Sequence, residues 1–205
     1  MAVTSTDLLM IERGGTLYKA PVSELPSGGG GGGEAGLTLL QKETITTTVA
    51  AIDFDLPSGY SRFRLIGQDV SAGTPNSYLL LSTNGGTGFL SSGYGYRLDG
   101  LQFTSASGRF SNFKASDSFM LLQQDQKYGV AFDYLITNTA NYFTLTGLTV
   151  GFQNEASECR GTTTYGHRIM SSIADVLRYT NVYGPTIGGD YSAGTLSLYG
   201  YKESV

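Results

Sequence analysis

The sequence predicts an all-β protein: an antiparallel, jelly-roll-like β-sandwich, preceded by a small N-terminal β-hairpin and a glycine-rich linker. Short apolar segments recur with frequent turn signals over residues 37–205, which is typical of sandwiches and barrels. Residues that favour strands and tight turns are abundant, including 14 tyrosines and 29 glycines. Only 15% of the residues are charged, against about a quarter in an average globular domain.

The N-terminal segment, residues 1–26, reads as a small hairpin. Two apolar runs flank Gly14-Gly15, a dipeptide that favours a hairpin turn. A two-stranded ribbon is marginally stable alone, so it must dock on another surface. We therefore expect this segment to be an anchor, carried by Leu8, Leu9, Ile11, Gly14, Gly15, Leu17 and Tyr18.

Residues 27–36 form the predicted linker between this hairpin and the sandwich of residues 37–205. The segment contains six consecutive glycines. Glycine loses the most backbone entropy on folding, which favours a flexible tether. A phosphate-binding loop of the Walker type would end in Gly-Lys-Ser or Gly-Lys-Thr, but here Glu34 and Ala35 follow the glycines.

Alternation predicts the first strands of the sandwich. Ile52, Phe54 and Leu56 alternate with Asp53 and Asp55, and Pro57-Ser58-Gly59 then predicts a turn. Further along, Phe63 and Leu65 alternate with Arg62 and Arg64, which predicts a second half-buried strand. The sequence Asn84-Gly85-Gly86 is a hairpin signal.

The last two segments are less uniform. The C-terminal stretch 194–202, "GTLSLYGYK", alternates and ends on aromatics, so we expect it to complete the sandwich. Residues 167–183 allow two readings. Ile169, Ile173, Val176 and Leu177 fall at helical spacing, whereas the position before the last strand favours a strand paired with it.

Composition argues against several partners. The net charge is −4 and the cations are scattered, so a basic stripe for nucleic acid is not expected. The sequence contains no stretch of 18 apolar residues, so we expect no membrane insertion. Its N-terminus lacks the pattern of a signal peptide. Cys159 is the only cysteine and no N-x-S/T site occurs, which suits folding in a cytoplasm.

Residues with catalytic chemistry are few. Cys159 and His167 form one candidate pair. Asp53 and Asp55 lie on one strand face, about 7 Å apart by strand geometry, where two carboxylates could hydrolyse a glycoside. Glu155 and Glu158 could bind a cation, but no calcium-loop pattern surrounds them. We expect structural roles for all of these residues, and therefore no catalytic residue, metal or cofactor.

Four tyrosines are candidates for a ligand or interface. Tyr94 and Tyr96 are separated by a glycine, and Tyr183 and Tyr191 lie in a segment rich in Gly, Asn and Asp. Exposed aromatic rings beside polar groups suit sugar stacking or a protein interface. The alternative is that they are ordinary strand-end tyrosines with packed rings and wet hydroxyls.

Two stretches, together about a sixth of the chain, carry a family resemblance. Residues 6–25, "TDLLMIERGGTLYKAPVSEL", resemble the short N-terminal segment of many tailed-bacteriophage virion proteins. Residues 190–202, "DYSAGTLSLYGYK", resemble the ending of β-sandwich domains in phage tail and virion structural proteins.

This resemblance implies a non-enzymatic virion protein: a short fibre, a tail fibre or a capsid decoration subunit. It implies a homotrimer, assembled in the host cytoplasm, that attaches to other virion proteins through residues 1–26. The alternative is an adhesion module for host attachment, in which the four tyrosines bind a host glycan or receptor. A third hypothesis, a depolymerase or hydrolase, depends on the Asp53–Asp55 or Cys159–His167 pair.

Overall fold

The computed structural model describes residues 8–13, 16–21, 36–74, 76–103, 108–123, 126–152, 158–181 and 190–202. These residues form fourteen β-strands and no helix. The chain divides into two compact units, residues 1–34 and residues 35–205. The predicted linker lies outside the described residues except for Gly36, which is the first residue of a strand.

The first unit contains the predicted hairpin. Strand β1 (Leu8–Arg13) pairs antiparallel with β2 (Thr16–Pro21), with Ile11 opposite Tyr18. The hairpin prediction is confirmed. Its turn residues, Gly14 and Gly15, lie outside the described residues.

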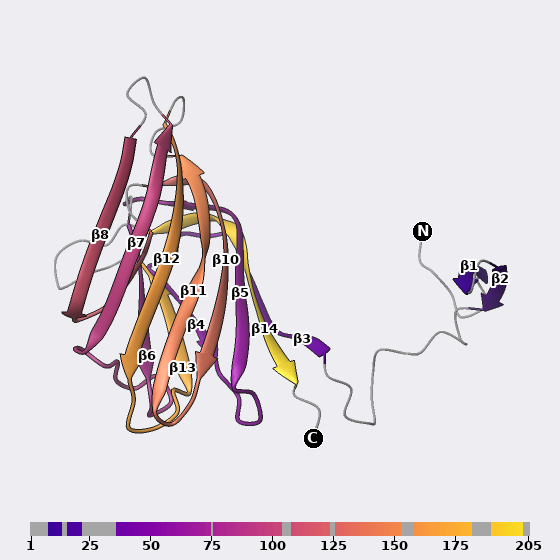
Figure 1. Ribbon diagram of the computed structural model, residues 1–205, viewed down its shortest axis with the longest axis horizontal. Helices are drawn as coiled ribbons and strands as arrows, with labels where there is room; N and C mark the ends of the chain where they lie inside the picture. Colours follow the sequence, from indigo (N-terminus) through magenta and orange to yellow (C-terminus); the bar gives the residue numbers. More distant parts are fainter. Residues whose placement is uncertain are drawn as a thin grey trace. The chain divides into compact units, whose positions relative to one another are not determined.

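The second unit is a sandwich of two antiparallel sheets, which confirms the predicted fold class (Figure 1). The large sheet has the spatial order β3 (Gly36–Ile45), β14 (Tyr191–Lys202), β5 (Arg62–Ala72), β10 (Tyr128–Asn138), β11 (Tyr142–Phe152), β12 (Cys159–Ile169), β7 (Tyr94–Phe103) and β8 (Gly108–Asp117). The small sheet has the order β4 (Ala51–Asp55), β13 (Val176–Thr180), β6 (Ser77–Ser82) and β9 (Met120–Gln123).

The core lies between the two sheets, and the predicted alternation places side chains in it. On β4, Ile52 and Phe54 are buried while Asp53 is exposed. On β5, Phe63 and Leu65 are completely buried. Apolar burial at every second position of a strand is the main term that holds the two layers together.

Four stacked rings join the layers at the centre of this core. Tyr191 lies 5.0 Å from Tyr179, Tyr179 lies 5.2 Å from Phe132, and Phe132 lies 5.0 Å from Tyr134, measured between ring centroids. The buried hydroxyls have partners: Tyr191 donates to Ser77 Oγ at 3.1 Å, and Tyr134 donates to a backbone carbonyl. Because these rings come from β14, β13 and β10, the stack spans both sheets.

Residues 167–183 contain two strand segments joined by an irregular stretch, and no helix, where the structure describes them. Strand β12 continues to Ile169, and Val176–Thr180 forms β13. The expected pairing of this segment with the last strand is wrong, since β13 pairs with β4 and β6. The chain crosses from the small to the large sheet after β13, and β14 then pairs with β3 and β5.

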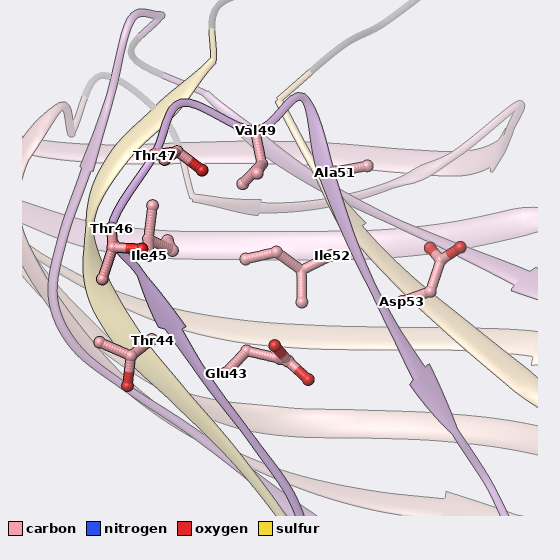
Figure 2. A pocket seen from close by; sticks show the side chains of 9 residues that line it. All are labelled: Glu43, Thr44, Ile45, Thr46, Thr47, Val49, Ala51, Ile52 and Asp53. Carbon is pink, nitrogen blue, oxygen red and sulfur yellow. The ribbon is translucent and has the colours of Figure 1, made fainter.

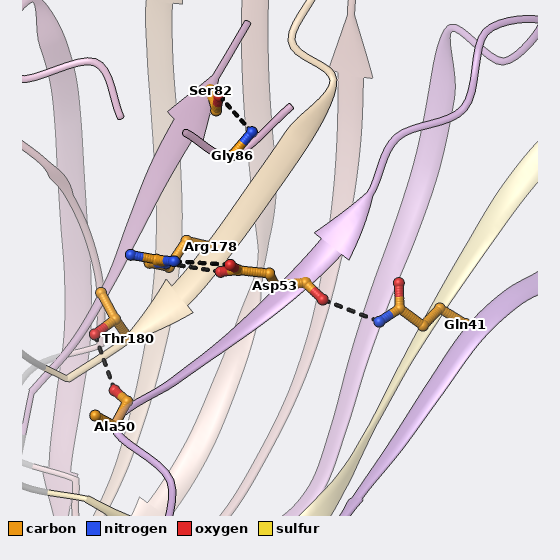
Figure 3. Close-up of polar contacts among 7 residues, drawn as sticks. All are labelled: Gln41, Ala50, Asp53, Ser82, Gly86, Arg178 and Thr180. Carbon is orange, nitrogen blue, oxygen red and sulfur yellow. Dashed lines mark hydrogen bonds and ion pairs between the residues drawn. The ribbon is translucent and has the colours of Figure 1, made fainter. Parts of the chain in front are cut away.

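The Asn84-Gly85-Gly86 segment is a turn, but it does not close a β-hairpin. Gly85 and Gly86 have φ values of 68° and 75°, as glycine-based turns require. The Ser82 Oγ accepts hydrogen bonds from the backbone N–H groups of Asn84 and Gly86, the latter visible in Figure 3. The strands on either side, β6 and β7, belong to different sheets, so the turn starts a crossover between them.

Candidate interaction face of the large sheet

The outer face of the large sheet carries the most exposed apolar surface among the described strands. Strand β11 has apolar residues on both sides: Phe143 and Leu145 face the core, while Leu148, Val150 and Phe152 are 61%, 50% and 45% exposed. An antiparallel sheet with one wet face normally alternates apolar with polar residues. Strand β11 departs from that rule.

A hollow of about 410 Å³ lies on this outer face. Its lining comes from four neighbouring strands, β11, β12, β7 and β8: Asp99, Gly100, Leu101, Arg109, Leu148, Thr149, Val150, Gly161, Thr162 and Thr163. Gly161 is opposite Val150 on one side and Leu101 on the other. A Cβ added at Gly161 would meet no atom within 4 Å, so the space above it is open. We call this feature the Gly161 hollow.

Charged groups border the Gly161 hollow. Arg97 Nε lies 2.7 Å from Asp99 Oδ2, and Arg109 is on the adjacent strand. A hydrogen bond from the Ser111 hydroxyl, and then one from Arg97, lower the pKa of Asp99. The Asp99 carboxylate is therefore ionised at neutral pH and can accept hydrogen bonds from a group that enters the hollow.

A second hollow of about 370 Å³ adjoins the first, with Leu148 shared between them. It is lined by Arg64, Asp133, Leu135, Thr146, Gly147, Leu148 and Tyr201. Arg64 Nε donates to Asp133 Oδ1 at 2.8 Å, and this bond raises the pKa of the guanidinium above its ordinary value. The two hollows and the exposed apolar residues beside them therefore extend across the middle of the outer face of the large sheet.

A third hollow, of about 310 Å³, lies at the corner where the chain turns from β3 to β4. Figure 2 shows its lining side chains, with Ile45 and Ile52 between the two strands. Its two carboxylates already have partners: Glu43 accepts from Gln41 Nε2 at 3.0 Å, and Asp53 is paired with Arg178. Both carboxylates of this hollow therefore already have a hydrogen-bonding partner.

Asp53 and Asp55, the candidate acid–base pair, have structural contacts instead (Figure 3). Arg178 donates two hydrogen bonds to the Asp53 carboxylate, both at 2.7 Å. Gln41 Nε2 donates to the Asp53 carbonyl, and the Asp55 N–H donates to Gln41 Oε1 at 3.2 Å. The Gln41 amide thus takes the place of a neighbouring strand at the free edge of β4.

Three of the four candidate tyrosines are buried, so the prediction that they face a ligand is wrong for them. Tyr94 and Tyr191 are completely buried and Tyr96 is 4% exposed. Tyr94 accepts the Leu81 N–H at 2.8 Å, and burial raises the pKa of its hydroxyl to about 12. Their strands turn these rings toward the core. Tyr183 lies outside the described residues.

The other candidate sites are not assembled. Cys159 and His167 are the first and ninth residues of β12, which separates them by about 26 Å along the strand. Glu155 lies outside the described residues. Within the described ranges, no three His, Cys, Asp or Glu side chains gather in a group suited to a metal ion. That same part of the chain contains no helix long and apolar enough to span a membrane.

Sequence reasoning missed the residues that form the outer face, namely Leu101, Leu148, Val150 and Gly161. The signal was present in "YFTLTGLTVGF", where apolar residues occupy both parities of one strand. Such a strand is apolar on both faces, which indicates either burial on both sides or an exposed interaction surface.

Comparisons with known proteins add no family. No family model matches the chain, and no curated protein matches it. Among solved structures, fructosyltransferase from A. japonicus is 12% identical, over 86% of this chain and 32% of that one, with a TM-score of 0.19. The infectious bursal disease virus VP2 subviral particle is 9% identical, over 96% and 47%, with a TM-score of 0.11. The chain spans less than half of either structure, and TM-scores this low carry no argument.

Proposed function

We propose that this chain is a non-enzymatic structural subunit of a tailed-bacteriophage particle: a short fibre, a tail fibre or a decoration protein. The observation that supports this most is the apolar outer face of the large sheet. Contiguous exposed apolar surface usually marks a place where another molecule packs. On this face, Leu148 and Val150 are at least half exposed, and they line a hollow that no described residue fills.

The sandwich would associate with copies of itself through this face. Eight strands spaced by about 4.8 Å, with about ten residues rising about 3.3 Å each, give a face of about 1,200 Å². A stable interface buries about 800 Å² on each partner. The face therefore offers enough area for an oligomer, and the resemblance favours a homotrimer.

The hairpin unit would attach the subunit to other virion proteins. Its two strands are too few to be stable alone, and they form a unit separate from the sandwich. Assembly would take place in the host cytoplasm, and the sandwich would be displayed from the particle. A glycan-binding role is not favoured as a second candidate, because three of the four tyrosines predicted to carry it are buried.

The test is whether the chain is part of a particle. Particles purified from its source by density gradient should contain peptides of this chain in a fixed copy number. A chain without residues 1–26 should keep the circular dichroism spectrum of the sandwich and be absent from the particles. Recovery of the intact chain only in the particle-free fraction would refute the proposal, and incorporation of the shortened chain would refute the anchor.

A further inference from the structure

Gly161 differs from the other glycines inside the described strands. A Cβ at Gly147 would lie 2.1 Å from the Asp133 carbonyl oxygen, and one at Gly166 would lie 2.0 Å from Met120 Sδ. Other strand glycines are explained by similar clashes or by a positive φ. Gly161 has neither, although glycine in a strand interior costs about 0.5–1 kcal/mol. Close approach by another molecule is one of the situations in which a strand retains such a glycine.

The opposite end of the same face carries a protruding apolar group. Ile169, the last residue of β12, is 82% exposed, and its cross-strand neighbour Tyr142 is 48% exposed. Ile173, in the segment that follows, is 55% exposed. We call Tyr142, Ile169 and Ile173 the apolar tip. Ile169 and Gly161 are eight residues apart on β12, which corresponds to about 26 Å.

We propose that the apolar tip of one copy of this chain inserts into the Gly161 hollow of a second copy. The inference depends on the self-assembly proposed above and assigns its contact. The walls of the hollow, Leu101, Leu148 and Val150, are all exposed and apolar, as is Ile169. The Tyr142 hydroxyl, the one polar side-chain group of the tip, can donate a hydrogen bond to the Asp99 carboxylate at the rim of the hollow.

The arrangement favours a second copy as the occupant for two reasons. The tip and the hollow occur on one chain, so each copy supplies both halves of the contact. They are also complementary patches on one face, so two copies can exchange tip and hollow reciprocally about a two-fold axis, or the contact can pass from copy to copy and close into a ring.

The test compares the solution mass of the full chain with that of four variants, by sedimentation over a range of concentrations. Gly161→Leu fills the hollow, and Ile169→Asp places a charge on the tip. Ser58→Leu adds the same leucine in the exposed turn between β4 and β5, outside the strands of the large sheet. Each variant should keep the native circular dichroism spectrum, since Gly161 has open space above it and Ile169 is exposed. Leu148→Lys, on the wall, is a second way to block the hollow.

We expect the intact chain and Ser58→Leu to form the same closed oligomer. Gly161→Leu and Ile169→Asp should each weaken it at least about tenfold, the loss that corresponds to exposing part of one isoleucine. Mixing these two variants should restore one contact and give a 1:1 complex. An intact oligomer unaffected by Gly161→Leu, Leu148→Lys and Ile169→Asp would overturn the assigned contact and leave self-assembly standing. A chain that stays monomeric would overturn self-assembly itself, whereas membership of a particle is decided separately by the peptide test.

Discussion

Replacing Asn138 by alanine should destabilise the sandwich strongly. Asn138 is the last residue of β10 and is 1% exposed. Its Nδ2 donates to the Ala174 carbonyl at 2.8 Å, and the Ala174 N–H donates to its Oδ1 at 3.1 Å. Ala174 is completely buried and directly follows Ile173 of the apolar tip. The Asn138 side chain therefore fixes Ala174, within the segment between β12 and β13, beside backbone hydrogen bonds at Met170 and Asp175.

The size of the effect follows from what remains after the truncation. Asn138→Ala leaves the N–H and C=O groups of Ala174 buried without these partners. Each unsatisfied buried group costs about 1–3 kcal/mol, so the loss of both partners should lower the free energy of unfolding by about 2–6 kcal/mol. Asn138→Leu should be no better, because it restores volume but neither hydrogen bond. The loss is a large part of the roughly 5–15 kcal/mol that stabilises a typical domain.

Urea denaturation measures this difference. The chain has 14 tyrosines and no tryptophan, so the near-ultraviolet circular dichroism of tyrosine reports the sandwich. The matched control is Asn141→Ala, in the exposed turn before β11, which should change the unfolding free energy by less than about 0.5 kcal/mol. If Asn138→Ala also cost less than about 1 kcal/mol at an unchanged denaturant slope, the amide would not be what holds Ala174.

Three further predictions concern the glycines, the free edge of β4 and the buried tyrosines. Under conditions where the chain is monomeric, Gly147→Ala should lower the free energy of unfolding by about 1–3 kcal/mol, because its Cβ would clash with a carbonyl oxygen. Gly161→Ala should be neutral or slightly stabilising, because the space above it is open. Equal effects in urea denaturation would contradict the packing argument. Gln41→Leu should lower the free energy of unfolding by about 1 kcal/mol, because two hydrogen bonds to β4 are lost. It should also speed aggregation in light-scattering assays, because the edge of β4 is uncovered. Unchanged scattering would mean that another part of the chain protects this edge. The pKa of Tyr94 is raised to about 12, above the unfolded value of about 10, so the folded state binds this proton more tightly than the unfolded state does. The free energy of unfolding should therefore be constant below pH 10 and fall between pH 10 and 12. Tyrosinate absorbance, followed with denaturation across this range, would contradict the reasoning if stability stayed level to pH 12.

The parts of the fold that depend on local pattern could be predicted from the sequence. Ile52 and Phe54 on β4, and Phe63 and Leu65 on β5, are buried at the predicted positions. In these strands one parity is apolar and the other is charged, so only one orientation hides the apolar side chains. The hairpin of β1 and β2 was predictable for a similar reason, because the turn residues fix the pairing of the strands beside them.

Pairing between distant segments could not be read in this way. Asn84-Gly85-Gly86 forms a turn as predicted, yet its flanking strands enter different sheets. Likewise, β13 follows β12 in the chain but pairs with β4 and β6. Turn chemistry is a property of a few consecutive residues, whereas the choice of sheet depends on packing over the whole core. A single sequence contains no direct record of that choice.

The tyrosines expose a second limit, because tyrosine is suited to both a core and a surface. Tyr94 and Tyr191 are buried, while Tyr165 on β12 is 50% exposed, and all three lie in strands with similar neighbours. Burial is acceptable when the hydroxyl has a partner: Tyr94 accepts the Leu81 N–H, and Tyr191 donates to Ser77. Those partners come from β6, in the opposite sheet, so the pattern of the tyrosine's own strand cannot reveal them.

Glycines in strands raise the same question, and here the structure separates the answers. A glycine can be required by its own φ, by a neighbouring atom, or by something outside the chain. Gly194, with φ at 122°, is of the first kind, and Gly147 and Gly166 are of the second. Gly161 has neither a positive φ nor a neighbouring atom in the way, so nothing in the described chain requires glycine at this position. The apolar walls beside it then identify the chemistry of what approaches, which is why the proposed contact is tested at this position first.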